Sequence, residues 1–202
     1  MSNFITLFDI TSHKDNIESL IGLLGSDDDN LRRNARESLI TIGKACVPLL
    51  ILELENFKTY KARWEATKAL GDIHDIRAIP ILIKTLSDEE GEEAWLAAEA
   101  LRKYKMNAWP ALLKELVKRG SDSDWLCHGA NHVFNKQKAN GLTKWLDILR
   151  NTLEVVSEPG AISVAAYNLL MKMKNDKSLI RKHTSTKNKV KSSAKQKSLE
   201  LV

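Results

Sequence analysis

The sequence has few of the residues that break a chain or cross-link it. Its 202 residues include 9 glycines, 4 prolines and 2 cysteines. So few turn-forming residues argue against a β-rich fold, which needs many tight turns. A single pair of cysteines cannot form the dense disulfide framework of a small secreted domain. The composition therefore predicts a protein that is nearly all helix and resides in a reducing cytoplasm.

Long apolar runs and catalytic motifs are also missing. No window approaches the about 18 to 20 consecutive apolar residues of a transmembrane helix. Residues 1–10 lack the cationic stretch and apolar core of an export signal, so we expect a soluble, unexported protein. The sequence contains no glycine-rich phosphate loop, nucleophile elbow or Cys-x-x-Cys pair. We therefore predict no catalytic residue, no metal and no cofactor.

Positive charge is concentrated at the C-terminal end. Residues 175–202 contain eight Lys or Arg against Asp176 and Glu200, a net charge of +6, whereas the whole chain carries +5. Residues 1–174 therefore carry −1 and are close to neutral. Low hydrophobicity and net charge predict a disordered tail over 175–202. The tail either solubilises the protein or contacts an acidic partner, RNA or an anionic membrane; the candidate anion contacts are Lys187, Lys189 and Lys191.

A cassette of apolar residues repeats along the chain with a period of about 31. Pro48, Pro80 and Pro110 recur at intervals of 32 and 30, each two residues before a leucine. A period of this length is typical of stacked supersecondary units. The fold expected for residues 1–174 is thus an all-α solenoid of about five helical hairpins. Three sets of residues share a register: Leu20, Leu50, Leu82 and Leu112; Ile21, Ile51, Ile83 and Leu113; Leu24, Leu54, Leu86 and Leu116.

The second helix of each unit carries small residues on one side. Ala35, Ala66 and Ala97 precede Leu39, Leu70 and Leu101 by four residues. In the fourth unit, Asn131 falls at the leucine position. Residues 142–174 are expected to form a closing hairpin, because residues 166–170 repeat the spacing from Ala66 to Leu70.

The junction at residues 66–80 (ATKALGDIHDIRAIP), together with residues 29–32 (DNLR) and the pair Ala62 and Arg63, resembles HEAT repeats. The similarity is to the short form associated with phycobilisome lyases, in bacteria and archaea, and covers about residues 17–116. This resemblance implies that the second helices line the concave face. It also implies that Arg32 and Arg63 bond to acidic groups of adjacent turns.

Three tryptophans are the main candidates for binding a partner. Trp64, Trp95 and Trp125 are separated by 31 and 30 residues and fall on successive second helices. Tryptophan is enriched at interface hot spots because it combines a large apolar area with a hydrogen-bond donor. We predict that these three side chains bind a partner, with Arg33 and Arg36 beside them. The alternative is that the rings pack between repeats.

Charged residues on the second helices suggest a polarised surface. Arg32, Lys61 and Arg63 are possible anion contacts, although the structural pairing described above is the alternative. Acidic residues follow in the third unit, including Glu92, Glu93 and Glu99. We therefore expect the surface to change from basic to acidic along the array.

One group of residues raises the question of a metal site. His128 and His132 are four residues apart on a predicted helix, next to Cys127. Two histidines at this spacing can bind one ion. However, the intervening residues lack the glutamate of a zinc hydrolase, and Cys127 points about 100° aside. Ordinary packing is the preferred interpretation.

The leading hypothesis is a noncatalytic scaffold that binds another protein on the concave face. A nucleic-acid-binding protein that uses the tail and the first two units is one alternative. The other is an accessory lyase or isomerase subunit that acts on a chromophore-bearing protein, which only the family resemblance suggests.

Overall fold

The computed structural model describes residues 15–56, 59–88, 91–120, 123–137, 139, 141–155 and 160–176, and all of its regular structure in these ranges is helical. Residues 15–23 form the first helix. The helices that follow are α2 (Asp29–Ile42), α3 (Val47–Leu54), α4 (Tyr60–Ile73), α5 (Ile79–Asp88), α6 (Gly91–Lys103), α7 (Trp109–Arg119), α8 (Asp124–Phe134), α9 (Thr143–Glu154) and α10 (Ala161–Asn175). Short 3-10 turns, η1 (Gly43–Ala45), η2 (Ile76–Ala78) and η3 (Lys105–Asn107), connect units.

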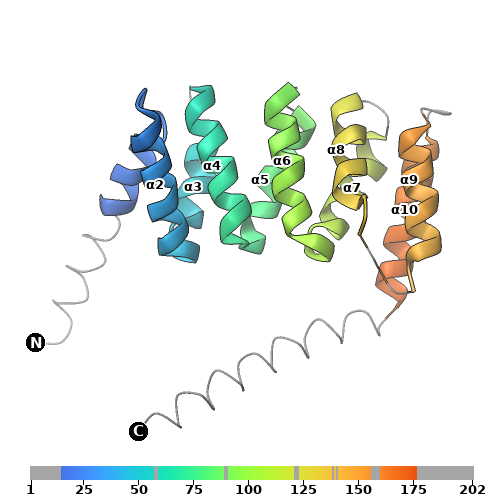
Figure 1. Cartoon of the computed structure of the whole chain (residues 1–202). Helices are drawn as coiled ribbons and strands as arrows, with labels where there is room; N and C mark the ends of the chain where they lie inside the picture. The colour runs from blue at the N-terminus through green and yellow to red at the C-terminus, as the bar shows by residue number, and fades with distance from the viewer. Residues whose placement is uncertain are drawn as a thin grey trace, which may run out of the picture.

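The helices form two rows, which confirms the predicted all-α solenoid. In Figure 1, α2, α4, α6 and α8 stand side by side, and the helix of residues 15–23, α3, α5 and α7 lies behind them. Residues that recur in the apolar cassette fill the space between the rows: Leu24, Leu50, Leu54, Leu82, Leu86, Leu112 and Leu116 are all buried. Each hairpin therefore buries its apolar side against the next unit as well as within itself.

The repeated prolines mark the starts of the first helices. Pro48, Pro80 and Pro110 are each the second residue of their helix, α3, α5 and α7. At this position the missing N–H costs nothing, because the first turn of a helix has no carbonyl partner for it.

The fourth unit has a different register from the one predicted. The buried Ala–Leu pairs of α2, α4 and α6 are the seventh and eleventh residues of their helices. In α8 those positions are Ala130 and Phe134, both 0% exposed, whereas Asn131 is half-buried. Phe134, not Asn131, therefore replaces the leucine. α8 begins 33 residues after the start of α6, whereas α4 and α6 each begin 31 residues after the second helix before them, so every residue of α8 is shifted relative to the 31-residue period.

The closing hairpin is present, but its two helices occupy opposite rows to those of the other hairpins. α9 packs against α8 in the second-helix row, and α10 packs against α7 in the first-helix row. α10 therefore lies in the first-helix row, although residues 166–170 repeat the spacing from Ala66 to Leu70. Ser163 of α10 donates a hydrogen bond to the carbonyl of Leu116 in α7, at 3.2 Å. Because α8 and α9 follow each other directly, they run antiparallel, whereas α4, α6 and α8 run parallel.

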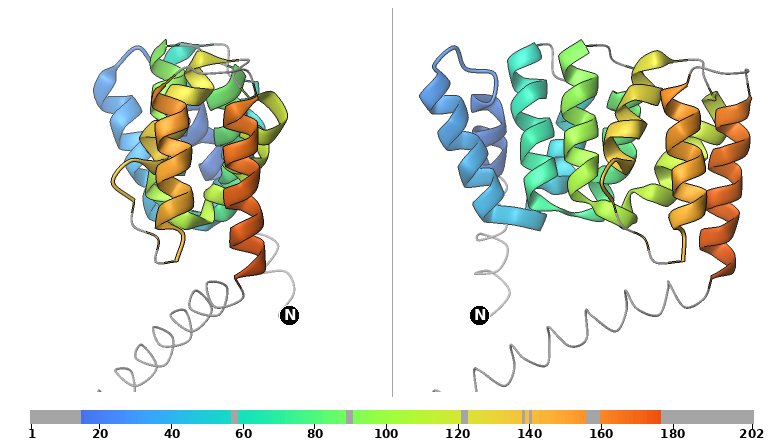
Figure 2. Two further views of the ribbon diagram at one scale, coloured as in Figure 1. Left: turned by 90° about the vertical axis from the view of Figure 1, so that its right-hand side faces the viewer. Right: turned by 45° about the vertical axis from the view of Figure 1, so that its right-hand side comes forward.

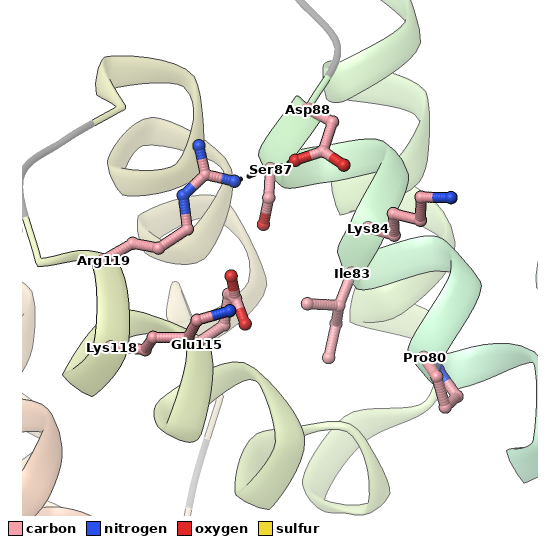
Figure 3. A pocket seen from close by; sticks show the side chains of 8 residues that line it. All are labelled: Pro80, Ile83, Lys84, Ser87, Asp88, Glu115, Lys118 and Arg119. Atoms are coloured by element: carbon pink, nitrogen blue, oxygen red, sulfur yellow. Dashed lines mark hydrogen bonds and ion pairs between the residues drawn. The ribbon is translucent and has the colours of Figure 1, made fainter.

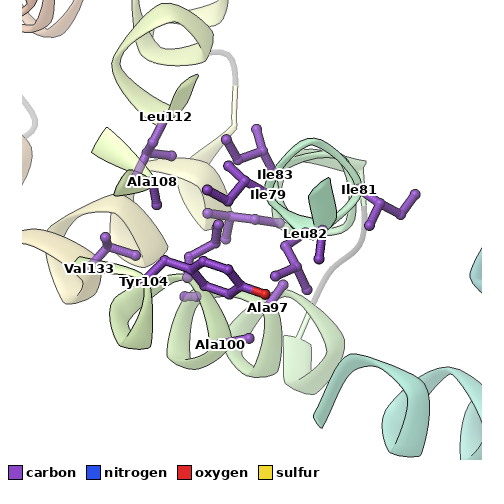
Figure 4. Packing of buried hydrophobic residues seen from close by; sticks show 14 of the residues in the cluster. Ile79, Ile81, Leu82, Ile83, Ala97, Ala100, Tyr104, Ala108, Leu112 and Val133 are labelled. Carbon is purple, nitrogen blue, oxygen red and sulfur yellow. The ribbon is translucent and has the colours of Figure 1, made fainter. Parts of the chain in front are cut away.

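Contacts between units are both apolar and polar. Figure 4 shows Tyr104 lying among Leu82, Ala97 and Ala100 in the interior. Its hydroxyl donates to the carbonyl of Leu70 in the preceding unit, at 2.6 Å. No helix in the described part of the chain combines the length and the apolarity that a membrane span requires.

Both cysteines lie in the interior and neither forms a disulfide. The Cys46 thiol donates to the carbonyl oxygens of Leu39 and Gly43, at 3.2 and 3.0 Å. Burial raises the pKa of the Cys46 thiol to about 11. Cys127 lies two units further along, with its sulfur 3.6 Å from the carbonyl oxygen of Gly120.

Candidate protein-binding face

Side-chain caps define where the second helices α2, α4 and α8 begin. Asp28 accepts hydrogen bonds from the backbone of Asn30 and Leu31 at the start of α2. Thr59 caps α4 in the same way and Ser123 caps α8. With the helix starts fixed, about 100° per residue sets the direction of each later side chain. We call the outward side of α2, α4, α6 and α8 the second-helix face.

Trp64 and Trp95 occupy the same place on this face. Each is the fifth residue of its helix and stands two residues before the buried alanine, about 160° away from it. Trp95 is 49% exposed, and Trp64 is half-buried. The Trp64 ring lies 5.5 Å from the Tyr60 ring, and the Lys68 ammonium lies 5.8 Å from its centroid. Both rings therefore point away from the core, although Trp64 is partly covered by neighbours of its own helix.

Trp95 belongs to a polar cluster that spans α6 and α8. Its ring lies 4.3 Å, centroid to centroid, from the ring of His132. His132 Nε2 is 2.7 Å from Oε2 of Glu99. Arg102 donates to the same oxygen at 3.1 Å and to Oε1 at 2.9 Å. The hydrogen bond from Arg102, and then that with His132, lower the pKa of Glu99 although partial burial opposes them. The cluster holds Trp95 beside an ionised carboxylate.

Trp125 is exposed but does not occupy the same place as the other two tryptophans. It is the second residue of α8 and is 37% exposed. Because of the shifted register, the fifth residue of α8 is His128, which is exposed. The sequence interval of 30 residues concealed this difference. Trp125 therefore lies on the same face, nearer the start of its helix.

The arginines of the first two units are largely engaged within the chain. Arg36 pairs with Glu65 of the next second helix, and Arg63 pairs with Glu93, at 2.6 Å. Arg32 donates to the carbonyl of Ser26, at 2.6 Å, and pairs with Asp29. The acidic partners of Arg32 and Arg63 lie on helices, Asp29 on the same helix and Glu93 on α6, rather than in adjacent turns. Arg33, by contrast, is an exposed residue of α2.

The face changes in charge along the array. Lys61 and Lys68 lie on α4, and the exposed Arg33 lies on the neighbouring helix α2. Lys61 pairs with Asp27 at 2.9 Å, and this hydrogen bond lowers the pKa of Asp27. On α6, Glu92 and Glu99 take the corresponding outward positions. Glu92 accepts a hydrogen bond from the Tyr60 hydroxyl at 2.6 Å, and desolvation together with this bond raises the pKa of Tyr60 to about 12.

The residues considered for a metal site are not brought together. Cys127 is buried, His132 pairs with Glu99, and His128 is exposed. In the ranges that the structure describes, no three His, Cys, Asp or Glu side chains are grouped so as to hold an ion. Lys187, Lys189 and Lys191 lie outside the described residues.

The opposite row has a groove of its own. Between α5 and α7 a space of about 450 Å³ is lined by Ile83, Ser87, Glu115 and Lys118, among others. Figure 3 shows Arg119 and Asp88 at one end of it, where they pair at 2.9 Å. Its walls alternate in charge and carry no exposed aromatic ring, so the second-helix face remains the stronger candidate.

Comparison with known proteins supports the repeat assignment. Residues 47–126, about two fifths of the chain, match the family model described as HEAT repeats. The matched region includes α3 to α7 and the first residues of α8. No curated protein and no solved structure matches the chain.

Proposed function

We propose that the protein is a noncatalytic scaffold that binds another protein on its second-helix face. The observation that carries this proposal is the exposure of Trp95 and Trp125 on helices whose opposite sides are buried. Large aromatic side chains left in water on one face are a common mark of an interaction site. The match of residues 47–126 to HEAT repeats, which commonly act as interaction scaffolds, supports the same conclusion.

The charges on the second-helix face indicate which residues a protein partner should carry. Arg33 and Lys68 on one part of the face call for acidic groups, and Glu92 on the next part calls for a basic group. A partner segment with acidic and basic residues at opposite ends, and an apolar residue between them for Trp95, fits this arrangement. Arg36 positions α4 through Glu65, so we assign it a supporting role rather than a direct contact.

Affinity purification from the source organism tests the proposal. The double variant Trp95→Ala and Trp125→Ala should lose the captured protein while remaining folded, with a melting temperature only a few degrees below that of the natural chain. Ile76→Ala, which removes an exposed apolar side chain away from the second helices, is the matched control and should retain the partner. Equal capture by all three proteins would refute the proposal.

Nucleic-acid binding is supported less well. The three predicted anion contacts that lie within the described residues, Arg32, Lys61 and Arg63, all have acidic partners within the chain. Arg33 and Lys68 are then the cations that could contact a nucleic acid. Binding of a nucleic acid that survives removal of residues 177–202 and weakens steeply with salt would favour this alternative.

Three further assignments are part of the same proposal. They are membership of the short phycobilisome-lyase type of HEAT repeat, a bacterial or archaeal origin and a cytoplasmic location. They rest on the resemblance of residues 66–80 and on the composition. An accessory lyase role depends on that subtype alone.

A further inference from the structure

Four connections that follow second helices share an unusual backbone conformation. Residues 43, 74, 105 and 136 recur at intervals of 31 and lie just after the ends of α2, α4, α6 and α8. All four have positive φ angles: Gly43 at 73°, His74 at 57°, Lys105 at 52° and Lys136 at 55°. Glycine adopts positive φ without a steric penalty, whereas a residue such as lysine rarely does. Glycine therefore suits all four positions, yet three of them carry a basic side chain.

His74 and Lys105 line the same cavity at this edge of the array. Figure 2, in its right view, shows the lower edge, where α4 and α6 end and the connection from α8 to α9 passes. The cavity has a volume of about 430 Å³ and is lined by seven residues: His74, Lys103, Tyr104, Lys105, Met106, Asn107 and Gln137. Three successive connections thus contribute to its walls.

The cavity is positively charged. None of its seven lining residues is acidic, whereas the groove between α5 and α7 includes Asp88 and Glu115. Lys103 pairs with Asp72 at 2.6 Å, but Lys105 has no acidic partner in the part of the chain that the structure describes. The charge of Lys105 is therefore uncompensated. A concave site lined by one sign of charge concentrates ions of the opposite sign.

The other polar groups of the cavity can bind an anion through hydrogen bonds. His74 Nδ1 lies 2.8 Å from the carbonyl oxygen of Asp72. Because a carbonyl only accepts, Nδ1 carries a proton and Nε2 is the nitrogen left for a ligand. The side-chain amides of Asn107 and Gln137 each have two N–H donors. An ammonium group and two amides around one space suit an anion with several acceptor oxygens.

We infer that this cavity binds a phosphate group, either of a soluble phosphate compound or of a lipid headgroup. Lysine is a common ligand of phosphate, whereas the planar carboxylate is matched best by arginine, which is not among the lining residues. A need for a cation here explains why lysine occupies position 105, where the backbone favours glycine. The cavity lies at the helix ends and not on the second-helix face, so this inference does not depend on the proposed protein partner.

A titration of the full chain with inorganic phosphate, followed by NMR, tests the inference. At constant ionic strength and pH 7, sodium phosphate should shift the backbone amide signals of residues 74 and 103–107. Because water screens the charge of an exposed lysine, half-saturation should fall at about 1 to 10 mM. Sodium acetate at the same concentrations should leave these signals unchanged.

Two glycine variants separate the side chains from the backbone. Lys105→Gly and His74→Gly allow the same positive φ and remove only the side chain, so circular dichroism should show unchanged helix content. Each should raise the phosphate concentration at half-saturation at least about tenfold, because a charge-assisted hydrogen bond is lost. Lys44→Gln is the matched control. It removes one exposed positive charge from the same edge, outside the cavity, and should change that concentration less than about twofold.

Vesicles distinguish a lipid headgroup from a soluble phosphate. Phosphatidate in phosphatidylcholine vesicles presents phosphomonoester groups, and co-sedimentation measures binding. If the ligand is a lipid, Lys105→Gly should bind these vesicles at least about fivefold more weakly than Lys44→Gln does. A response to inorganic phosphate without this difference identifies a soluble ligand. Residues 177–202 are present in all the proteins compared, so their charge cannot produce the difference.

The inference fails in three cases. The first is the absence of any amide shift with phosphate, together with equal vesicle binding by Lys105→Gly and Lys44→Gln. The second is an equal loss of phosphate binding in these two variants, which would mean that net charge alone attracts the anion. The third is an equal response to acetate and phosphate, which would mean that the cavity does not select phosphate.

Discussion

The guanidinium of Arg63 on α4 donates hydrogen bonds to both carboxylate oxygens of Glu93 on α6, at distances from 2.6 to 3.2 Å. Similar pairs join the other second helices: Arg36 to Glu65 between α2 and α4, and Glu99 to His132 between α6 and α8. Each junction in this row thus has a polar link beside its apolar contacts.

Replacement of Arg63 should destabilise the protein. In Arg63→Met, the Glu93 carboxylate, only 9% exposed, loses its partner and remains buried, at a cost of about 1 to 3 kcal/mol. Urea unfolding measures the change. Lys84→Met, which breaks the exposed Lys84–Glu55 pair, is the control and should cost under about 0.5 kcal/mol. Equal effects in the two variants would contradict this account.

Replacement of two helical glycines by alanine should change the stability of the protein in opposite directions. A Cβ added at Gly71 would lie 2.9 Å from the Cβ of Ala100 and 3.2 Å from its Cα, so α4 and α6 would have to move apart. We expect Gly71→Ala to lose about 1 to 3 kcal/mol. At Gly22 a Cβ meets nothing within 4 Å, so Gly22→Ala should gain about 0.5 to 1 kcal/mol. Thermal unfolding measures both, and a stabilised Gly71→Ala would show that the two helices are not so closely packed.

Asp75 should contribute stability that is lost in acid. Arg77 donates to both of its carboxylate oxygens, through Nε at 3.0 Å and Nη2 at 2.9 Å, and these bonds together with the Arg77 backbone N–H lower the pKa of Asp75 to about 2. Because the folded pKa is depressed below its usual 3.8, the contribution is complete above about pH 4 and disappears as pH falls towards 2.

Asp75→Asn keeps the cap but cannot ionise. It should lower stability at pH 7 by about 1 kcal/mol and show less loss of stability than the natural chain between pH 4 and 2. Urea unfolding at several pH values gives both quantities. Parallel curves for the two proteins would mean that Asp75 does not titrate as described.

Exposed and buried tryptophans should differ in their effect on stability. Trp109 is fully buried and its ring lies 5.4 Å from that of Phe134, so Trp109→Ala should cost about 3 to 5 kcal/mol. Trp95→Ala removes a ring that is half exposed and should cost under about 1.5 kcal/mol. Denaturation followed by circular dichroism compares them. A comparable loss in Trp95→Ala would place that ring in the core and weaken its proposed role in binding.

Much of the fold could be predicted because burial repeats with the sequence period. The leucine registers and the alanine positions of α2, α4 and α6 follow from spacing alone. The fourth unit escaped prediction because α8 begins 33 rather than 31 residues after α6, so that Phe134, and not Asn131, falls at the position of the leucine. The row exchange of α9 and α10 depends on which neighbouring helix each one contacts, and periodicity contains no information on that choice.

The candidate site was predicted only in part. Helical angles indicated that Trp64 and Trp95 point away from the alanines, but how much each ring is exposed depends on neighbours such as Tyr60 and His132. An acidic partner for Arg63 was expected from the family resemblance, but in an adjacent turn rather than on α6. The contact between Glu99 and His132 was missed, because it joins residues 33 apart across the shifted register, although the three-residue spacing from Glu99 to Arg102 was visible in the sequence.

The burial of both thiols gives the molecule two natural reporters of local opening. Cys46 lies at the junction of the first two units and Cys127 in the fourth. A protonated, enclosed sulfur such as that of Cys46 reacts with an alkylating reagent only when its surroundings open. Alkylation rates at the two sites, measured separately by peptide mass, therefore reveal whether the array frays from one terminus or melts in a single concerted step.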